Sequence, residues 1–459
     1  MVFLGCAKET RESVEYHELV EMENFLPMFE NEDFSQYFSK DKEGLFARIE
    51  RKNALDAFFR NSWQPAQVSG GLLVAHKGEI IFEDYLGYAN FEQKTPLNAA
   101  TPIHIASISK VMTAAVVLKL VEKNYLKLQD KVSKHLPSFP DQKTTIMHLL
   151  NHRSGLPKYE YFPHDAQYWD SKAMQSNENI LRYLAAGKGI RNFETGTSFA
   201  YSNTNYALLA LIIEKVTKKK YHEVMRTMLF EPLEMKNTFV FHIEDSARVS
   251  QSYTFYNKRW EFNFLDNIYG DKNIYSTPQD ILKFDKAMYS TKFLSKSLKK
   301  QMKSGYSYEK RGVKNYGLGI RLMEFDNGKT LYYHNGWWHG NFTTYVHGEE
   351  EQFTIIALGN RQTREVYDAF RLSGLFGEYP IPLNNVEAVE ETVVEVDSLA
   401  LDSIQNPAAE ILADQKPDKE LYPKDNKKDK KPVTALELPV QNIEPENQVP
   451  AQLDSIRKP

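Results

Sequence analysis

A serine and a lysine stand three residues apart in the stretch "HIASISKVMTAAVVLKLVEK", residues 104–123. On a helix, residues at positions i and i+3 share one face, so Ser107 and Lys110 would be neighbours. A serine hydroxyl is a poor nucleophile until a base takes its proton, and burial lowers the pKa of a lysine toward that role. The N–H groups at the start of a helix would stabilise negative charge that develops beside Ser107. The pattern therefore suggests nucleophilic catalysis.

The spacing has an ordinary alternative, because Ser-x-x-Lys is frequent by chance. A serine that caps a helix, followed by an exposed lysine, gives the same letters. Taken alone, this stretch favours the capped helix. Other parts of the chain must decide between the two interpretations.

Tyr201 and Asn203 stand two residues apart just before an apolar run of helical character, in "FAYSNTNYALLALIIEKVT". A tyrosine beside a cationic lysine can shuttle a proton as a phenolate. An asparagine close by can bond both that lysine and a substrate amide. The alternative is a turn in which Asn203 or Thr204 caps the following helix.

His334 and Gly336 lie on an expected strand in "YYHNGWWHGNFTTY". A glycine there lets a substrate approach the backbone, and a histidine supplies charge or a proton. A solvent-facing histidine beside a glycine turn is the alternative. Trp337 and Trp338 either place bulk beside this position or turn into the core, as aromatic side chains commonly do.

Taken together, these three motifs resemble the serine β-lactamase and penicillin-binding protein superfamily in its class C-related branch. That branch has Ser-x-x-Lys, then Tyr-x-Asn, then Lys-Thr-Gly or His-x-Gly, in the order found here. The resemblance extends over about residues 70–360 and includes "TTIMHLLNHRSGLP", "FEPLEMKNTFVF", "NIYSTPQDILKF" and "YGLGI". It implies roles for each motif.

The resemblance makes Ser107 the acylated nucleophile and Lys110 its principal proton acceptor. Tyr201 would be the general acid/base that delivers a proton to the leaving group, and Asn203 would orient the substrate and the lysine. The reaction implied is a two-step acyl transfer in which water hydrolyses an acyl-enzyme. No cofactor is expected.

On the strand, the resemblance makes His334 the replacement for the lysine of Lys-Thr-Gly. The oxyanion hole would consist of the backbone N–H groups of Ser107 and of Trp337, the residue after Gly336. A neutral histidine holds a substrate carboxylate less firmly than a lysine does, because an ordinary imidazole titrates near pH ~6.5. His-x-Gly is more similar to the D-aminopeptidase, DD-peptidase and esterase relatives than to efficient β-lactamases.

The function expected is hydrolysis of D-amino-acid peptides of peptidoglycan, or of esters, by a serine acyl-hydrolase. A true class C-like β-lactamase and a catalytically idle penicillin-binding or scaffold protein remain the alternatives. The expected partner is a small-molecule or peptide substrate, and the oligomeric state is left open. A G-x-S-x-G esterase is disfavoured because the chain has no such motif.

His148 and His152 have the i, i+4 spacing of a metal-binding pair on a helix. No acidic residue or third histidine lies at ligand spacing from them. A structural role is therefore expected, and no metal site.

The elements that must position these motifs follow a simple order along the chain. Residues 43–59 predict an amphipathic helix, and residues 70–89 predict a hairpin that turns at His76-Lys77-Gly78. Helical patterns dominate from about 101 to 298, and strand patterns return before a final helix at "RQTREVYDAFRLSGLF". The expected fold is α/β, in layered α+β form. A five-stranded antiparallel sheet would be built from both ends of the domain, flanked by helices, with an inserted all-helical lobe.

Composition and sequence patterns limit the functions and the domain organisation that we expect for the chain. The chain has 459 residues, 26% charged, and a net charge of -4, which argues against nucleic-acid binding. We expect a leader or spacer at 1–42, a catalytic domain at 43–380 and a disordered, charged, Pro-rich tail at 381–459. The single cysteine, Cys6 in "MVFLGCAKE", resembles the end of a lipoprotein signal without its charged region. A lipid anchor there would place the protein in a bacterial cell envelope, periplasmic or lipid-anchored.

Overall fold

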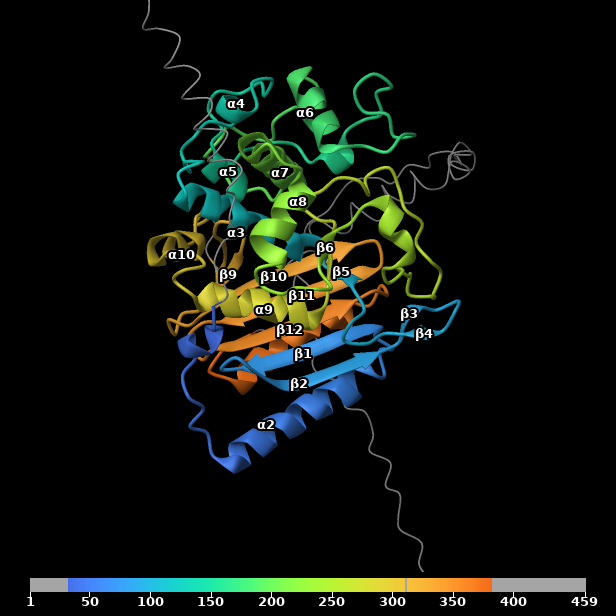
Figure 1. The fold of residues 1–459 in the computed structure, drawn as a ribbon, viewed down its shortest axis with the longest axis vertical. Helices are drawn as coiled ribbons and strands as arrows, with labels where there is room; N and C mark the ends of the chain where they lie inside the picture. The colour runs from blue at the N-terminus through green and yellow to red at the C-terminus, as the bar shows by residue number, and fades with distance from the viewer. Residues whose placement is uncertain (1–31, 310–311, 382–459) are drawn as a thin grey trace, which may run out of the picture. The chain divides into compact units, whose positions relative to one another are not determined.

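The computed structural model describes residues 32–309 and 312–381, and its centre is a seven-stranded antiparallel sheet (Figure 1). The strand order is β2-β1-β12-β11-β10-β9-β8. The strands are β1 (Gly70–His76), β2 (Glu79–Leu86), β8 (Lys314–Tyr316), β9 (Arg321–Glu324), β10 (Thr330–Trp338), β11 (Asn341–Gly348) and β12 (Phe353–Gly359). Strand β1 pairs with β12 from Gly70↔Gly359 to His76↔Phe353, so both ends of the domain do build the sheet. The expected count of five was too low, because the short β8 and β9 extend the edge beyond β10.

The predicted hairpin is confirmed between β1 and β2. Lys77 and Gly78 at its turn both have positive φ, 51° and 80°, a conformation that suits a two-residue connection. Every residue of β1, β11 and β12 is buried. Such strands require cover on both faces of the sheet, and helices supply it.

One face of the sheet carries α2 (Leu45–Phe58) and η7 (Arg364–Leu375). The apolar core here joins Leu55, Phe59 and Trp63 to inward side chains of the sheet. The final helix predicted from the sequence is present as this η7, in 3-10 form. This face lies away from the residues expected to do chemistry.

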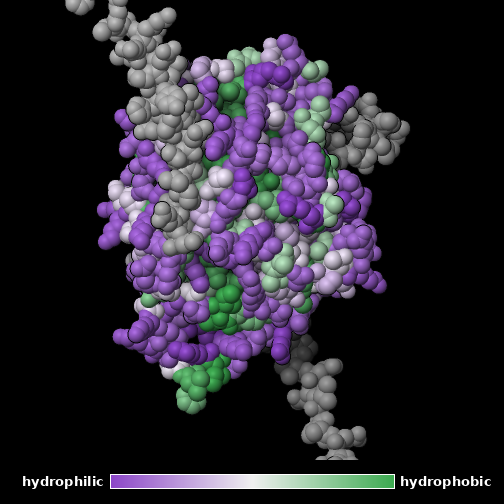
Figure 2. Space-filling model, in the orientation of Figure 1, coloured by the Kyte–Doolittle hydropathy of each residue, from purple (hydrophilic) through white to green (hydrophobic). Residues whose placement is uncertain are grey.

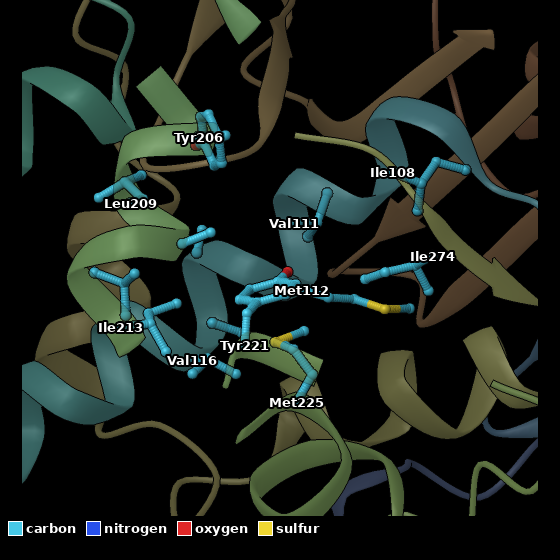
Figure 3. Close-up of a cluster of buried hydrophobic side chains, with 14 of the residues drawn as sticks. Ile108, Val111, Met112, Val116, Tyr206, Leu209, Ile213, Tyr221, Met225 and Ile274 are labelled. Atoms are coloured by element: carbon cyan, nitrogen blue, oxygen red, sulfur yellow. The ribbon is translucent and has the colours of Figure 1, made fainter. Parts of the chain in front are cut away.

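The helical lobe and α9 cover the other face (Figure 1). Its helices are α3 (Ser109–Glu122), α4 (Val132–His135), α5 (Ile146–Leu150), α6 (Asn177–Ala185), α7 (Asn203–Thr217), α8 (Tyr221–Met225), α9 (Pro278–Tyr289) and α10 (Lys296–Met302). Helix α3 is buried from Ser109 to Leu120 and packs against α7 and α8 in the core shown in Figure 3. A helix that is apolar all round must lie inside the protein, so α3 holds whatever begins it in a fixed place.

Two small sheets complete the described fold. Strands β3 (Tyr88–Asn90) and β4 (Thr95–Pro96) pair with each other. Strands β5 (Ile103–His104), β7 (Ile274–Ser276) and β6 (Phe239–Val240) form a three-stranded sheet. β5 leads directly into the Ser107 segment.

Part of the expected spacer belongs to the folded domain. The short η1 (Phe34–Tyr37) precedes Phe38, whose ring lies 4.8 Å from that of Tyr289. Ser290 Oγ donates to Glu32 at 2.6 Å. The remaining predictions for the termini, at Cys6 and in the tail after residue 381, lie outside the described residues. No helix within residues 32–309 and 312–381 is both long and apolar enough to cross a membrane.

Candidate active site

Ser107 lies in η3 (Ala106–Ile108), one turn of 3-10 helix that directly precedes α3. The preceding Ala106 has φ of 48°, in the left-handed region that costs an alanine about 1 kcal/mol or more. Its N–H donates to Nδ1 of the buried His104 at 3.0 Å. From the sheet, Thr343 Oγ1 donates to the carbonyl of Ile105 at 2.9 Å. The serine is therefore presented on a strained turn that β5 and β11 hold in place.

Lys110 follows one turn later and its side chain is fully buried. Its Nζ lies 2.9 Å from Ser107 Oγ and donates to the carbonyl of Asp271 at 2.8 Å. The exposed lysine of the capped-helix alternative is therefore wrong. The distance and the burial are those that proton transfer from serine to lysine requires.

Tyr201 and Asn203 reach the same place from the start of α7. Lys110 Nζ lies 5.0 Å above the Tyr201 ring centroid. Asn203 is the first residue of α7, but its side chain does not cap the helix. Its Nδ2 donates to Glu160 Oε1, and its Oδ1 is buried with no hydrogen-bond partner among the described residues. A substrate amide could donate to that oxygen.

His334 and Gly336 enter from β10. Strand β9 pairs with β10 only from Thr330 to Tyr333, so residues 334–338 have no strand of the described chain on that side. The segment that begins η3 lies over the face of the sheet at Gly336: a Cβ on this glycine would come within 2.7 Å of the Ile105 carbonyl oxygen and 2.9 Å of Ala106 Cβ. Gly336 is thus needed for the contact between β10 and the nucleophile segment, in addition to the approach of substrate expected from the sequence.

The two tryptophans point to opposite faces, as successive residues of a strand must. Trp337 packs at the border of the core beneath α2 and η7. Trp338 lies on the other face, where its Nε1 donates to Asp266 at 2.7 Å and Lys272 Nζ lies 4.5 Å above its ring. Of the two alternatives left open by the sequence, both indoles therefore pack into the protein: Trp338 is buried in the core on the lobe side, and Trp337 packs, partly buried, against the other core.

His334 is buried and electrically neutral. Burial, with the positive charges of Arg321 and Lys110, holds the pKa of His334 well below its usual value. Its Nδ1 lies 2.7 Å from the carbonyl oxygen of Asn335 and its Nε2 lies 3.2 Å from the hydroxyl of Tyr316. These partners assign the proton to Nδ1, which donates, and leave Nε2 as the acceptor.

Three residues at the site carried no motif. Arg321, on β9, places its guanidinium 4.9 Å above the Tyr201 ring. Glu160 bonds Asn203, and burial followed by the charge of Asp271 raises its pKa. His104 stands at the head of the serine stretch. None has a characteristic spacing from the others, so only folding brings them together.

His148 and His152 separate in the structure. His148 forms a capping box with Thr145 at the start of α5. His152 accepts the Ser202 N–H at 3.2 Å, and its ring lies 4.3 Å from that of Tyr201. Burial and the charge of Lys110 lower the pKa of His152 well below its usual value. His152 therefore packs beneath the tyrosine, the structural role expected for it.

The Beta-lactamase family matches residues 55–374 of this chain, which contain every residue of the site. Penicillin-binding protein 4* of Bacillus subtilis is 32% identical over 72% of this chain and 78% of its own length. The D-aminopeptidase of Brucella anthropi is 26% identical over 73% of this chain and 65% of its own length. These two relatives are thus a penicillin-binding protein and a D-aminopeptidase.

Solved structures show the same fold. A penicillin-binding protein from Bacillus halodurans superposes with a TM-score of 0.61 at 23% identity, over 69% of this chain and 99% of the other. An octameric penicillin-binding protein homologue from Pyrococcus abyssi superposes with a TM-score of 0.62 at 24% identity, over 74% of this chain and 81% of the other. The layered sheet and helical lobe are those of these proteins.

Proposed function

Because this chain belongs to the Beta-lactamase family, we propose that it is a serine acyl-hydrolase acting through an acyl-enzyme on D-amino-acid peptides of peptidoglycan or on esters. The observation that carries the proposal is the 2.9 Å approach of Lys110 Nζ to Ser107 Oγ, in a buried setting beside Tyr201. A peptidoglycan substrate would be met in a bacterial cell envelope, which is the location we propose.

In the first step, Ser107 Oγ attacks the substrate carbonyl carbon while its proton passes to Lys110 Nζ. The N–H groups of Ser107 and Trp337 would bond the resulting oxyanion, and their positions on η3 and on the open edge of β10 support this assignment. The bond to the leaving group then breaks. Tyr201 gives a proton to the leaving amine or alcohol and takes up the proton held by Lys110, so Lys110 is neutral again while the serine remains acylated.

In the second step, a water attacks the acyl carbonyl and gives up a proton to Lys110 or Tyr201. The ester bond to Ser107 breaks, and Oγ recovers its proton as the acid leaves. Both steps need the same donors in the same place, so one preorganised site serves both.

Two features support a D-amino-acid peptide or an ester over a β-lactam, whose carboxylate would need a cation beside the serine. His334 is neutral, so the negative group of a substrate would rely on Arg321, which lies beyond Tyr201. The open edge of β10 after Tyr333 suits an extended peptide added as a further strand. The relatives include a D-aminopeptidase.

The test is a substrate panel on purified protein: p-nitrophenyl esters, D-amino-acid amides, D-Ala-D-Ala peptides and nitrocefin. Ser107→Ala is compared with Ser109→Ala, because Lys110 Nζ bonds Ser107 Oγ whereas Ser109 Oγ accepts from the N–H of Ile274. We expect ester or D-peptide hydrolysis that Ser107→Ala abolishes and Ser109→Ala retains. A fluorophosphonate or fluorescent penicillin should label the peptide that contains Ser107.

Two results would overturn the proposal. High turnover of nitrocefin with poor D-peptide hydrolysis would make the protein a β-lactamase. A Ser107 that neither probe labels, together with no hydrolysis of any substrate, would leave a catalytically idle binding protein.

A further inference from the structure

The first half of α2 exposes a group of large apolar side chains. Leu45 is 71% exposed, Phe46 is 83% exposed and Ile49 is 46% exposed. In Figure 2 an apolar group protrudes at the lower left, where Figure 1 places the start of α2. Phenylalanine and leucine side chains that are exposed to this extent lack the favourable free energy that their burial would contribute.

These side chains are not needed for the core. In α2 only Leu55 is buried, and the apolar stripe continues from it at helical spacing to Phe59 and Trp63. The helix is therefore anchored through its C-terminal end. The sequence predicts an amphipathic helix over 43–59, but its apolar N-terminal residues meet no sheet.

Basic side chains surround this group. Residues 40–52 contain five basic and three acidic side chains, although the whole chain has a net charge of -4. Asp41 is paired with Arg48 at 3.0 Å, and Glu43 is paired with Arg51. The lysines of this segment, Lys40, Lys42 and Lys52, form no ion pair with any described residue. Their charges face solvent.

A recess of about 570 Å³ opens beside the helix, between the 35–41 segment, the β1–β2 turn and α2. Its charged lining is predominantly basic: Lys40, Lys52, Lys77, Lys286, Arg48 and Arg51, against Asp41 and Glu79. An anionic group is the ligand that such a lining attracts.

We propose that the α2 surface, defined as Leu45, Phe46 and Ile49 with Lys40, Lys42 and Lys52, docks the protein on an anionic phospholipid surface. Apolar side chains would enter the boundary between headgroups and acyl chains, and the lysines and the recess would bind headgroup phosphates. This pairing of an apolar group with a basic rim is the pattern of interfacial helices.

The charge distinguishes this occupant from a second copy of the chain. A two-fold interface would bring the same basic residues of two copies together, and like charges oppose one another. Docking through α2 also leaves the site uncovered, because α2 packs on the sheet face opposite the one that meets η3 and α3. The inference is independent of what Ser107 attacks.

The experiment is co-sedimentation of the full chain with vesicles of phosphatidylcholine alone or with about 30% phosphatidylglycerol. We expect binding to the anionic vesicles that weakens with salt. The double variant Leu45→Ser/Phe46→Ser should weaken it about tenfold or more, and Lys42→Glu/Lys52→Glu about fivefold or more. Residues 1–31 are the same in every variant, so any difference between variants belongs to the α2 surface.

Matched controls carry the same chemical changes elsewhere. Ile190→Ser/Tyr256→Ser removes two apolar side chains that are 85% and 87% exposed, and Lys215→Glu/Lys236→Glu reverses two other charges. Both should bind vesicles like the wild type, and all variants should retain ester hydrolysis. Wild-type protein that ignores anionic vesicles, or α2 variants that bind as well as the controls, would overturn the proposal. So would a dimer in sedimentation velocity that Leu45→Ser/Phe46→Ser dissociates, since a second copy would then occupy the surface.

Discussion

The Ser107 site and a second buried polar cluster lie along the same face of β11. Thr343, Tyr345 and His347 alternate along this strand, so their side chains share a face. Thr343 bonds the segment that carries the serine, whereas Tyr345 and His347 bond Asp285 of α9. We define the Asp285 cluster as Asp285, Lys303, Tyr345, His347 and Thr354.

Hydrogen bonding separates the two regions. In the Asp285 cluster the carboxylate accepts from Tyr345 at 2.6 Å, from His347 at 2.7 Å and from Thr354, and Lys303 donates to His347 at 2.9 Å. The site differs, because it holds buried atoms that have no hydrogen-bond partner among the described residues, including His152 Nε2, Glu160 Oε2, Asn203 Oδ1 and Asp271 Oδ1.

A buried polar group without a partner costs free energy, so a fold keeps such groups where something else will bind. The Asp285 cluster is complete and serves to join α9 and α10 to the sheet. The Ser107 site is incomplete, as a site that awaits substrate must be. His347 therefore has a structural role in the Asp285 cluster, whereas His334 belongs to the incomplete site, although both histidines are buried on neighbouring strands.

The largest expected effect separates activity from stability at the site. Lys110→Met keeps the length of the side chain but removes the proton acceptor, so kcat/KM for an ester substrate should fall about 10³-fold or more. The free energy of unfolding should stay the same or rise, since a buried amine is replaced by an apolar group. Urea unfolding beside steady-state kinetics measures both. A variant that loses stability in proportion to activity would show that Lys110 is mainly structural.

The reverse result is expected at the Asp285 cluster. Asp285→Ala leaves the hydroxyls of Tyr345 and Thr354 and the ring of His347 without their acceptor, and should lower the free energy of unfolding by about 3 kcal/mol or more. The kcat/KM of the folded protein should change little, because no member of the cluster contacts Ser107 or Lys110. Asp285→Asn, which keeps one acceptor oxygen, should lose less. A large loss of activity in a stably folded variant would contradict this division.

The pH dependence of stability should report the neutral histidines around the site. Burial lowers the pKa of His104 to about 3, and the pKa values of His152 and His334 also lie well below the ordinary value near ~6.5. Below that pH the unfolded chain binds protons that the folded chain does not. Stability should therefore fall from pH 7 to pH 5, by up to about 1.4 kcal/mol per pH unit for each histidine.

His334→Gln removes one of these groups and should reduce that slope, measured by urea unfolding at pH 7, 6 and 5. His164→Gln is the matched control, because His164 is half exposed. If the two substitutions change the slope equally, His334 is not held neutral by the fold.

The smallest effect is expected at the rim of the Asp285 cluster. Lys303 Nζ lies 3.1 Å from Glu349, whose side chain is 46% exposed. Glu349→Gln should lower the free energy of unfolding by only about 0.5–1 kcal/mol, because solvent screens a pair of this kind. Thermal unfolding at low and high salt checks this, and the difference from wild type should shrink as salt rises. A loss as large as that of Asp285→Ala would extend the buried cluster to its rim.

The local patterns predicted much of this protein. Alternating and continuous apolar runs gave the hairpin, the strands of the sheet and its construction from both ends. They missed β8 because a strand of three residues has too few side chains to show a period. The helix at residues 43–59 was correct, yet the pattern could not show that Leu45 and Phe46 lie beyond the sheet, since periodicity defines a face but not what covers it.

The three motifs predicted from the sequence, at Ser107/Lys110, Tyr201/Asn203 and His334/Gly336, meet in one place. The residues of each motif are two or three positions apart, so the geometry of one helix or strand was enough to predict that they would be neighbours. The partners of these residues were not visible: His104 behind the serine turn, Glu160 on Asn203 and Arg321 over Tyr201 come from β5, η4 (Tyr159–Tyr161) and β9.

The sequence by itself therefore determined which residue types could do chemistry and on which elements they stand. The tertiary structure alone decided that Lys110 is buried against Ser107, that His334 is neutral and that Trp337 and Trp338 pack against the cores on opposite faces of the sheet. The physical reason is that burial and charge depend on neighbours from distant segments, which no local spacing records. The sequence shows that Lys110 follows Ser107 by three residues, but only the folded chain sets the distance between their side chains and excludes water from the lysine.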